Sequence, residues 1–204
     1  MTNPFADTAA KAARDTTNSQ ERNQLWWETK PMTYAEWKQA DRLPKTEADF
    51  EEIEQYVLRT GPFLKQWFST ATLNGQACID IGSGSGIFSS MLARRGAQVS
   101  AVDLTEAAVR LTRQTARIFD VDINLVRADV EHMPFLSDRF DFAFSWGVLH
   151  HTSDMAGAVA EMGRILKTGG RGMIMVYHRN SVVYYLHGLF WLLARGKIWH
   201  GYNL

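Results

Sequence analysis

One stretch of this chain constrains its fold more than any other: the run from Cys78 to Phe88, CIDIGSGSGIF. It opens with an apolar segment that carries a single acid, Asp80, and it closes with the apolar pair Ile87 and Phe88. Three glycines lie between these parts at alternate positions, and glycine adopts backbone conformations that other residues rarely reach. The run therefore predicts a buried strand, a tight glycine-rich turn and the start of a helix.

Strand and helix patterns alternate beyond this turn. Strands are expected at 76–81, 98–102, 123–127, 140–145 and 171–177. Apolar residues recur at helical spacing between them, in the sets Ile87, Phe88, Met91 and Leu92; Leu104, Ala108, Leu111, Thr115 and Ile118; and Met155, Val159, Met162 and Leu166. The KTGG run that follows is expected to end the last helix at a glycine. These repeated units predict an α/β fold, a Rossmann-like, doubly wound parallel sheet with helices on both faces.

The N-terminal part of the chain divides into two further regions. Residues 1–24 are polar and lack an apolar period, which predicts a mobile arm or a marginal helix. Residues 25–75 form an extension in which a helix is expected, capped by Thr46 and broken at Gly61. Four aromatics gather near the start of this extension: Trp26, Trp27, Tyr34 and Trp37. They either plug the surface of the main domain, 76–204, or form a lid over its active site.

Charge and cysteine content bear on the compartment and the partners. The chain has 22 basic and 22 acidic residues, so it offers no overall attraction to nucleic acid or anionic lipid. No apolar run approaches the roughly 20 residues of a membrane-spanning helix. The nearest, 182–194, is short and is interrupted by His187. The N-terminus shows no signal-peptide core and the lone Cys78 cannot form an internal disulfide, so we expect a cytoplasmic protein without integral membrane contact.

The glycine turn marks a ligand site, because ligands of parallel sheets bind beyond the carboxyl ends of the strands. Gly82, Gly84 and Gly86 are expected to let a ligand approach the backbone. A dinucleotide fingerprint would need a third glycine at position 87, which is Ile87, and no Gly-Lys-Ser/Thr follows for a P-loop. The carboxylate of Asp80 suits a ligand that carries an ammonium group rather than a pyrophosphate.

Two more acids follow the next two strands. Asp103 lies twenty-one residues after Gly82, where an acidic side chain accepts hydrogen bonds from ribose hydroxyls in both NAD and adenosyl cofactors. Asp129 ends the third strand and is placed to accept from an adenine amino group. Together with Asp80, these acids form one constellation at three successive strand ends, although each of them alone would more often be a helix cap or a loop residue.

Three segments of the chain resemble a known family. They are CIDIGSGSGIFSSMLARRGAQVSAVDLTEAAV, RADVEHMPFLSDRFDFAFSWGVLHHTSD and EMGRILKTGGRGMIM, within about residues 76–177. In this order they resemble the seven-stranded, S-adenosylmethionine-dependent class I methyltransferases, in the branch that includes ubiquinone and menaquinone C-methyltransferases and many small-molecule enzymes. Thr168 stands where the family usually has proline before its fifth strand. The resemblance implies transfer of a methyl group from S-adenosylmethionine to a small-molecule acceptor.

The resemblance also implies a cofactor site without a metal. It places the methionine end of the cofactor at the glycine turn, the ribose at Asp103 and the adenine beside Leu104. The cofactor-contacting positions carried over from the family are Asp80, Gly82, Ser83, Gly84, Gly86, Asp103, Leu104, Asp129, Val130, Ser145 and Trp146.

The chemistry of methyl transfer asks little of the protein beyond approach geometry and exclusion of water, since the sulfonium is already a good leaving group. A base is needed only when the nucleophile starts protonated. His150 and His151, in WGVLHHTSD after the fourth strand, are the candidates. The alternative to a catalytic role is a structural one, in which one histidine caps the following helix and the other packs against the protein.

The acceptor and the assembly stay open at this level. Candidates to enclose an apolar or aromatic acceptor are Tyr177, His178 and the segment 184–199. Arg179 is a candidate to steer an acidic acceptor. The alternative is that these aromatic residues fill the core. The family adds an antiparallel hairpin after its fifth strand, whereas this sequence stops at Leu204 after an apolar helix. Either the chain is truncated, or the sheet edge is covered by a partner such as a second copy, or by the N-terminal segment.

Two other functions compete with methyl transfer. One is a non-catalytic cofactor-binding or scaffold protein with a methyltransferase fold. The other is a nicotinamide oxidoreductase, which Ile87 disfavours.

Overall fold

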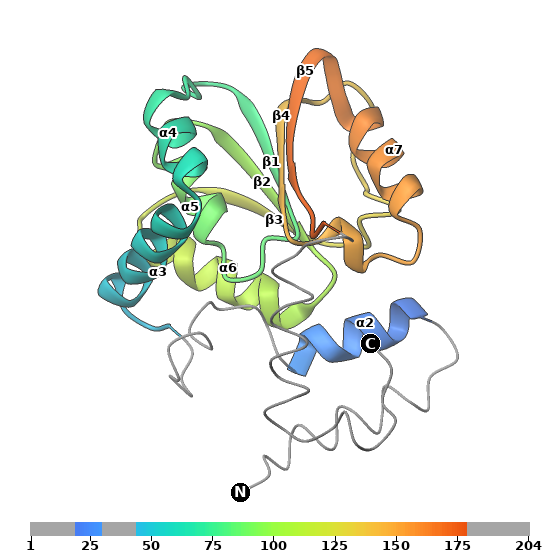
Figure 1. Cartoon of the computed structure of the whole chain (residues 1–204), viewed down its shortest axis with the longest axis horizontal. Helices are drawn as coiled ribbons and strands as arrows, with labels where there is room; N and C mark the ends of the chain where they lie inside the picture. Colours follow the sequence, from blue (N-terminus) through green and yellow to red (C-terminus); the bar gives the residue numbers. More distant parts are fainter. Residues whose placement is uncertain (1–18, 30–43, 179–204) are drawn as a thin grey trace, which may run out of the picture.

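The computed structural model describes residues 19–29 and 44–178, which form a parallel sheet and its covering helices (Figure 1). The strands are β1 (Ala77–Ile81), β2 (Gln98–Asp103), β3 (Ile123–Arg127), β4 (Phe140–Trp146) and β5 (Leu166–Met175). They lie in the order β3-β2-β1-β4-β5, and every neighbouring pair is parallel. The order reverses between β1 and β4, so the switch point of the sheet lies there. The α/β prediction is confirmed.

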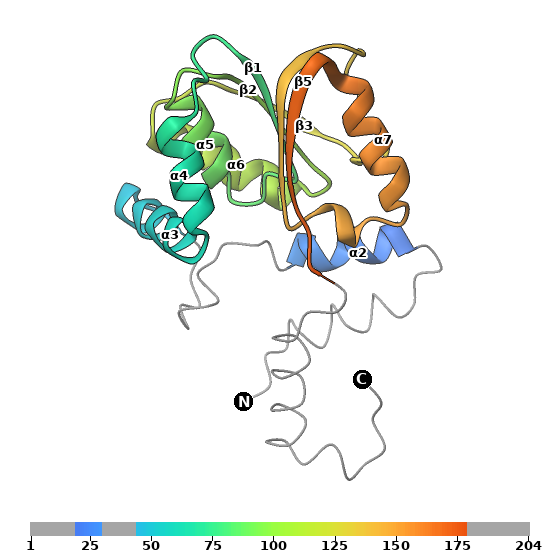
Figure 2. The ribbon, with the colours of Figure 1, turned by 45° about the horizontal axis from the view of Figure 1, so that its top comes forward.

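Helices cover both faces of this sheet. The described helices are α2 (Ser19–Thr29), which lies at the carboxyl ends of the strands, and α3 (Glu47–Thr60), α4 (Pro62–Thr70), α5 (Ile87–Ala93), α6 (Glu106–Ile118) and α7 (Met155–Ile165), with a 3-10 turn η2 (Leu149–His151). Figures 1 and 2 show α3 to α6 on one side of the sheet and α7 on the other. Alternate residues of β1 serve the two layers: Cys78 packs with the α3–α6 layer, whereas Ile79 and Ile81 pack on the α7 side.

The helices α3 and α4 form as their sequence predicts. The Thr46 hydroxyl accepts from the Asp49 amide at 3.2 Å, and the Asp49 carboxylate accepts from the Thr46 amide at 2.9 Å, which makes a capping box. α4 begins at Pro62, where the missing amide hydrogen of proline costs no helical bond. Its Trp67 stacks on Phe142 of β4 with ring centroids 4.8 Å apart, so α4 is fixed against the sheet.

The junction between α7 and β5 corrects two expectations. The helix ends at Ile165 and the strand begins at Leu166, so the KTGG run lies inside an irregular strand rather than after the helix. Gly169 does take a left-handed conformation (φ +82°), where the register between β4 and β5 shifts. Met155 and Val159, expected on the buried face of the helix, are 41% and 40% exposed. The buried positions of α7 are Ala158, Met162 and Ile165.

Some expectations concern residues outside the described ranges. These are the first part of the N-terminal arm, Tyr34, Trp37, Arg179 and the segment 184–199. The last residues of the expected arm, from Ser19 on, are helical and belong to α2. Among the residues that the structure describes, no helix is both long enough and apolar enough to cross a membrane.

Candidate active site

The glycine turn after β1 holds three residues in left-handed conformations. Gly82, Gly84 and Gly86 have φ of +79°, +53° and +77°, which strain any residue with a Cβ atom. Two of them also face neighbouring protein. A Cβ on Gly86 would lie 2.7 Å from the Cα of Thr112, and one on Gly82 would lie 2.2 Å from a methyl of Val148. These two glycines are therefore required by the backbone and by close packing, and not solely by the approach of a ligand.

A cavity of about 320 Å³ opens at the carboxyl ends of the strands, beside this turn. This volume lies within the range of ligand pockets, on the order of 300–1,000 Å³. Its wall contains eight of the eleven predicted cofactor positions: Gly82, Ser83, Gly84, Asp103, Leu104, Asp129, Val130 and Trp146. The other three, Asp80, Gly86 and Ser145, do not line it. The structure thus brings together most of a set that is scattered over four strand ends in sequence.

Asp103 is fixed at the end of β2 by the turn it faces. One carboxylate oxygen accepts from the Gly84 amide at 3.0 Å. The other accepts from the amide and the hydroxyl of Thr105 at 3.0 and 2.9 Å. Burial raises the pKa of Asp103, and the hydrogen bonds from Thr105 and Gly84 act in the opposite direction by favouring the charged form. The side chain is therefore preoriented at the cavity wall before any ligand binds.

Asp129 lines the same cavity from the turn that follows β3. Its carboxylate accepts from the Glu131 amide at 3.0 Å, in the turn that follows β3. The side chains of Asp129, Glu131 and His132 also place potential metal-ligand atoms within 4.8 Å of one another. Clusters of exposed acids of this kind are common without an ion, so the cluster alone does not define a metal centre.

Asp80 and Ser145 lie behind the cavity wall rather than in it. The Asp80 side chain is 1% exposed, and its carboxylate accepts from the Ser89 hydroxyl at 2.5 Å. Burial raises the pKa of Asp80 to about 7, and the Ser89 hydrogen bond only partly offsets that effect. The Ser145 hydroxyl donates to the carbonyl of Ile81 at 3.1 Å. Both side chains therefore bond to neighbouring protein at β1, and their direct contact with a cofactor stays a prediction.

The two histidines occupy different places. His151 lines the cavity, whereas His150 does not, and their ring centroids are 4.1 Å apart. Burial and the neighbouring His151 lower the pKa of His150 to about 4, and burial lowers the pKa of His151. Both imidazoles are therefore neutral at pH 7. Neither caps the next helix, because Asp154 does so by accepting from the Gly157 amide at 2.9 Å.

Several residues of the cavity wall were not singled out from the sequence. Asn23 belongs to the expected arm, Tyr56 and Thr60 lie on α3, and Met175 ends β5. Trp27, one of the clustered aromatics, lines the cavity and meets His151 edge to face at 5.2 Å. Trp27 thus lies at the cavity, and the lid stays a prediction. The only sequence pattern that could have pointed to Tyr56 and Thr60 is their position on the less apolar face of α3.

Comparison with known proteins identifies the domain. The family described as "Methyltransferase domain" matches residues 79–174. This chain carries a class I S-adenosylmethionine-dependent methyltransferase domain. The matched residues run from β1 to β5 and thus contain the turn, Asp103, Asp129 and the histidine pair. The family implies S-adenosylmethionine as the cofactor.

Individual relatives agree with this assignment. A ubiquinone biosynthesis O-methyltransferase of Alkalilimnicola ehrlichii is 32% identical over 55% of this chain and 46% of its own length. The biotin biosynthesis bifunctional protein BioHC of Cellvibrio japonicus is 30% identical over 78% of this chain and 31% of its own. A solved S-adenosylmethionine-dependent methyltransferase of Mesorhizobium loti is 28% identical over 57% of this chain and 53% of its own, with a TM-score of 0.51. The chain spans about half the length, or less, of these relatives.

The methyltransferase site fits the cofactor that the family implies. Asp103 presents a half-buried, preoriented carboxylate where a ribose would need acceptors, and Leu104 and Val130 supply apolar contacts for an adenine ring. The left-handed turn from Gly82 to Gly84 lies beside them with backbone at the cavity wall. No described residue of the wall is a lysine or arginine, so the cation of a sulfonium meets no like charge there.

Proposed function

We propose that this methyltransferase domain transfers the methyl group of S-adenosylmethionine to a small, neutral, aromatic acceptor that carries a hydroxyl group. The single observation that carries the proposal is that one cavity joins the cofactor positions to an aromatic wall. That wall consists of Trp27, Tyr56, Phe88, Trp146 and Tyr177, with His151 among them. Adjacent places for a cofactor and an acceptor in one cavity are what an in-line methyl transfer requires.

Charge and chemistry narrow the acceptor. The described wall has no cation that would pair with an acidic acceptor, and its aromatic rings favour a planar one. The name of the relative from Alkalilimnicola ehrlichii specifies O-methylation, which supports an oxygen nucleophile here as well. A hydroxyl nucleophile starts protonated, so it needs a base, and His151 is the neutral imidazole at the wall.

Each group of residues at the cavity has its own role in the proposed reaction. The bound cofactor supplies an activated methyl group on a sulfonium. Asp103 holds the ribose, Leu104 and Val130 hold the adenine, and the aromatic wall orients the acceptor and excludes water. His151 accepts the hydroxyl proton as the new bond forms.

We also propose a cytoplasmic location, which is consistent with the single buried Cys78. A second copy is proposed to pair along the edge of β5, at or next to which Ile174 and Val176 are exposed.

The first test is calorimetric titration of the purified chain with S-adenosylmethionine, S-adenosylhomocysteine and NADH. We expect both adenosyl ligands to bind and NADH not to bind. Turnover of a panel of phenols and catechols then separates an enzyme from a protein that only binds the cofactor. Binding of NADH alone, or of no ligand, would contradict the proposal.

A histidine variant tests the proposed base. His151→Asn should lower kcat for a hydroxyl acceptor by about 100-fold, the lower end of what general-base catalysis contributes. Because the pKa of His151 is lowered, the wild type should keep its activity from pH 8 down to below pH 6.5 and lose it only as the imidazole is protonated. That acid limb should be missing in the variant. An unchanged kcat, with cofactor affinity also unchanged, would remove His151 from catalysis.

A further inference from the structure

The helix α2 crosses the site from outside the matched methyltransferase region. Figures 1 and 2 show it lying across the carboxyl ends of the strands, where the cavity opens. None of the side chains described in α2 is fully buried, and Trp26 is 40% exposed. Of its described apolar side chains, Leu25 and Trp27 are half-buried, so apolar contact contributes to the position of this helix but no fully buried face fixes it. Its attachment depends on a few side-chain contacts, and these lie on both sides of the cavity.

One attachment is at the start of α6, where the free backbone amides can be accounted for completely. The first amides of a helix have no partner within the helix. The Thr105 amide donates to Asp103, and the Ala108 amide donates to the Thr105 hydroxyl at 3.2 Å. The amides of Glu106 and Ala107 remain, and both donate to Glu28 of α2.

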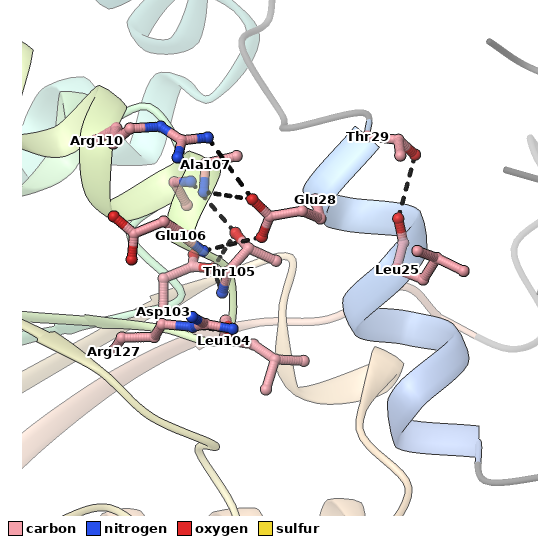
Figure 3. A network of polar contacts seen from close by, with 11 residues as sticks. Leu25, Glu28, Thr29, Asp103, Leu104, Thr105, Glu106, Ala107, Arg110 and Arg127 are labelled. Carbon is pink, nitrogen blue, oxygen red and sulfur yellow. Dashed lines mark hydrogen bonds and ion pairs between the residues drawn. The ribbon is translucent and has the colours of Figure 1, made fainter.

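Glu28 acts as a two-pronged acceptor for these amides, as Figure 3 shows. One carboxylate oxygen accepts from Glu106 at 2.9 Å, and the other accepts from Ala107 at 3.1 Å. The helix dipole of α6 adds to this attraction, because its positive end faces the carboxylate. Arg110 also lies 3.7 Å from Glu28, but its side chain is 62% exposed and water screens the pair. The contact is thus made to the same turn that orients Asp103.

The other attachment is to the loop after β4. Asn23 donates a hydrogen bond to the carbonyl of His151, and Trp27 packs edge to face on the His151 ring. Both Asn23 and Trp27 line the cavity. The helix therefore bridges the wall that follows β2 and the wall that follows β4, with Glu28 as its charged anchor.

We propose that Glu28 is a positioning residue, a latch that holds α2 across the cavity and so controls the release of cofactor and the enclosure of the acceptor. The effect on ligand rests on the proposed function, whereas the latch itself does not. Glu28 touches neither ligand: it places Trp27 and Asn23, which do line the cavity. Loss of the latch leaves the cofactor contacts of Asp103 intact and lets α2 open more often.

The latch is tested first without any ligand, by hydrogen exchange. In Glu28→Gln, the amides of Glu106 and Ala107 should exchange about tenfold faster than in the wild type, because a weaker acceptor replaces the carboxylate. Glu21→Gln is the matched control, since it removes the same charge from the exposed first turn of the same helix. It should leave these amides unchanged. Unchanged exchange in Glu28→Gln, with an intact circular dichroism spectrum, would overturn the latch.

The effect on ligand is then measured by stopped flow. Glu28→Gln should release S-adenosylhomocysteine about tenfold faster and raise the KM of the acceptor while changing kcat less. Arg110→Gln should change both much less. Faster exchange without faster release would overturn control of the site by the latch. If even the wild type binds no adenosyl ligand, the proposed function fails, and the exchange experiment still decides whether the latch exists.

Discussion

Replacing Asp103 with alanine is expected to weaken binding of S-adenosylhomocysteine by about 1,000-fold, or about 4 kcal/mol, because two hydrogen bonds from ribose hydroxyls to a carboxylate are lost. The preorganised carboxylate makes the effect large. In the wild type, Gly84 and Thr105 already orient it, so binding does not have to order the side chain. The measurement is calorimetric titration of both proteins at pH 7.5.

Two further variants separate lost contact from lost structure. Asp103→Asn keeps one acceptor oxygen and the shape of the side chain, and should retain part of the affinity. Asp122→Ala removes an exposed acid just before β3, at the far end of the sheet from the cavity, and should bind as the wild type does. If Asp103→Ala is folded by circular dichroism and binds within threefold of the wild type, the ribose does not lie at Asp103.

The second large effect is a dependence of stability on pH that comes from Asp80. Its pKa in the folded state is about 7, well above the value of 3.8 expected when it is unfolded. Between these values the folded protein binds more protons than the unfolded chain, so its free energy of unfolding falls as the pH rises. The contribution is present below pH 4 and lost above pH 7. A shift of this size corresponds to about 4 kcal/mol.

The Asp80 contribution is best measured as a difference, because other groups titrate in the same range. The lowered pKa of His150 acts in the opposite sense, since the folded state then binds fewer protons between about pH 4 and 6.5. Urea unfolding of the wild type and Asp80→Asn is therefore compared at each pH from 4 to 8. The contribution of His150 is the same in both proteins, so it cancels in the difference between their free energies of unfolding. The stability of the variant relative to the wild type should rise with pH. With Asp122→Asn as the control, a difference that stays flat would mean that folding does not raise the pKa of Asp80.

The strands, the turn and the cofactor set were accessible from the sequence because they are local. A buried strand followed by glycines at alternate positions has few alternative structures, and the apolar runs predict the bounds of β1 to β4 to within one residue. Because parallel strands bring these ends to one edge, Asp103 and Asp129 could be expected together. The family pattern then placed Leu104, Val130 and Trp146 at the same cavity, and all three line it.

Other features depend on neighbours that local patterns do not encode. The side chains of alternate strand residues face opposite ways, and packing against Ser89 decides that Asp80 lies behind the wall. The helical spacing of Leu166 predicted that it belongs to the last helix, but its backbone pairs with Phe140 in the sheet. Only the folded chain places Glu28 on amides that are 78 and 79 residues away.

The sequence alone determined the class of fold and, to within one residue, the bounds of β1 to β4, since apolar periodicity and turn glycines act over a few residues. The chemical type of the ligand followed from the resemblance to a family. The tertiary structure decided which of the predicted residues face the cavity, which histidine is available and where α2 rests. Those outcomes follow from burial and from the pairing of backbone amides between distant segments. Such pairing gives a hydrogen-bond partner to backbone amides whose partner cannot be read from the neighbouring sequence.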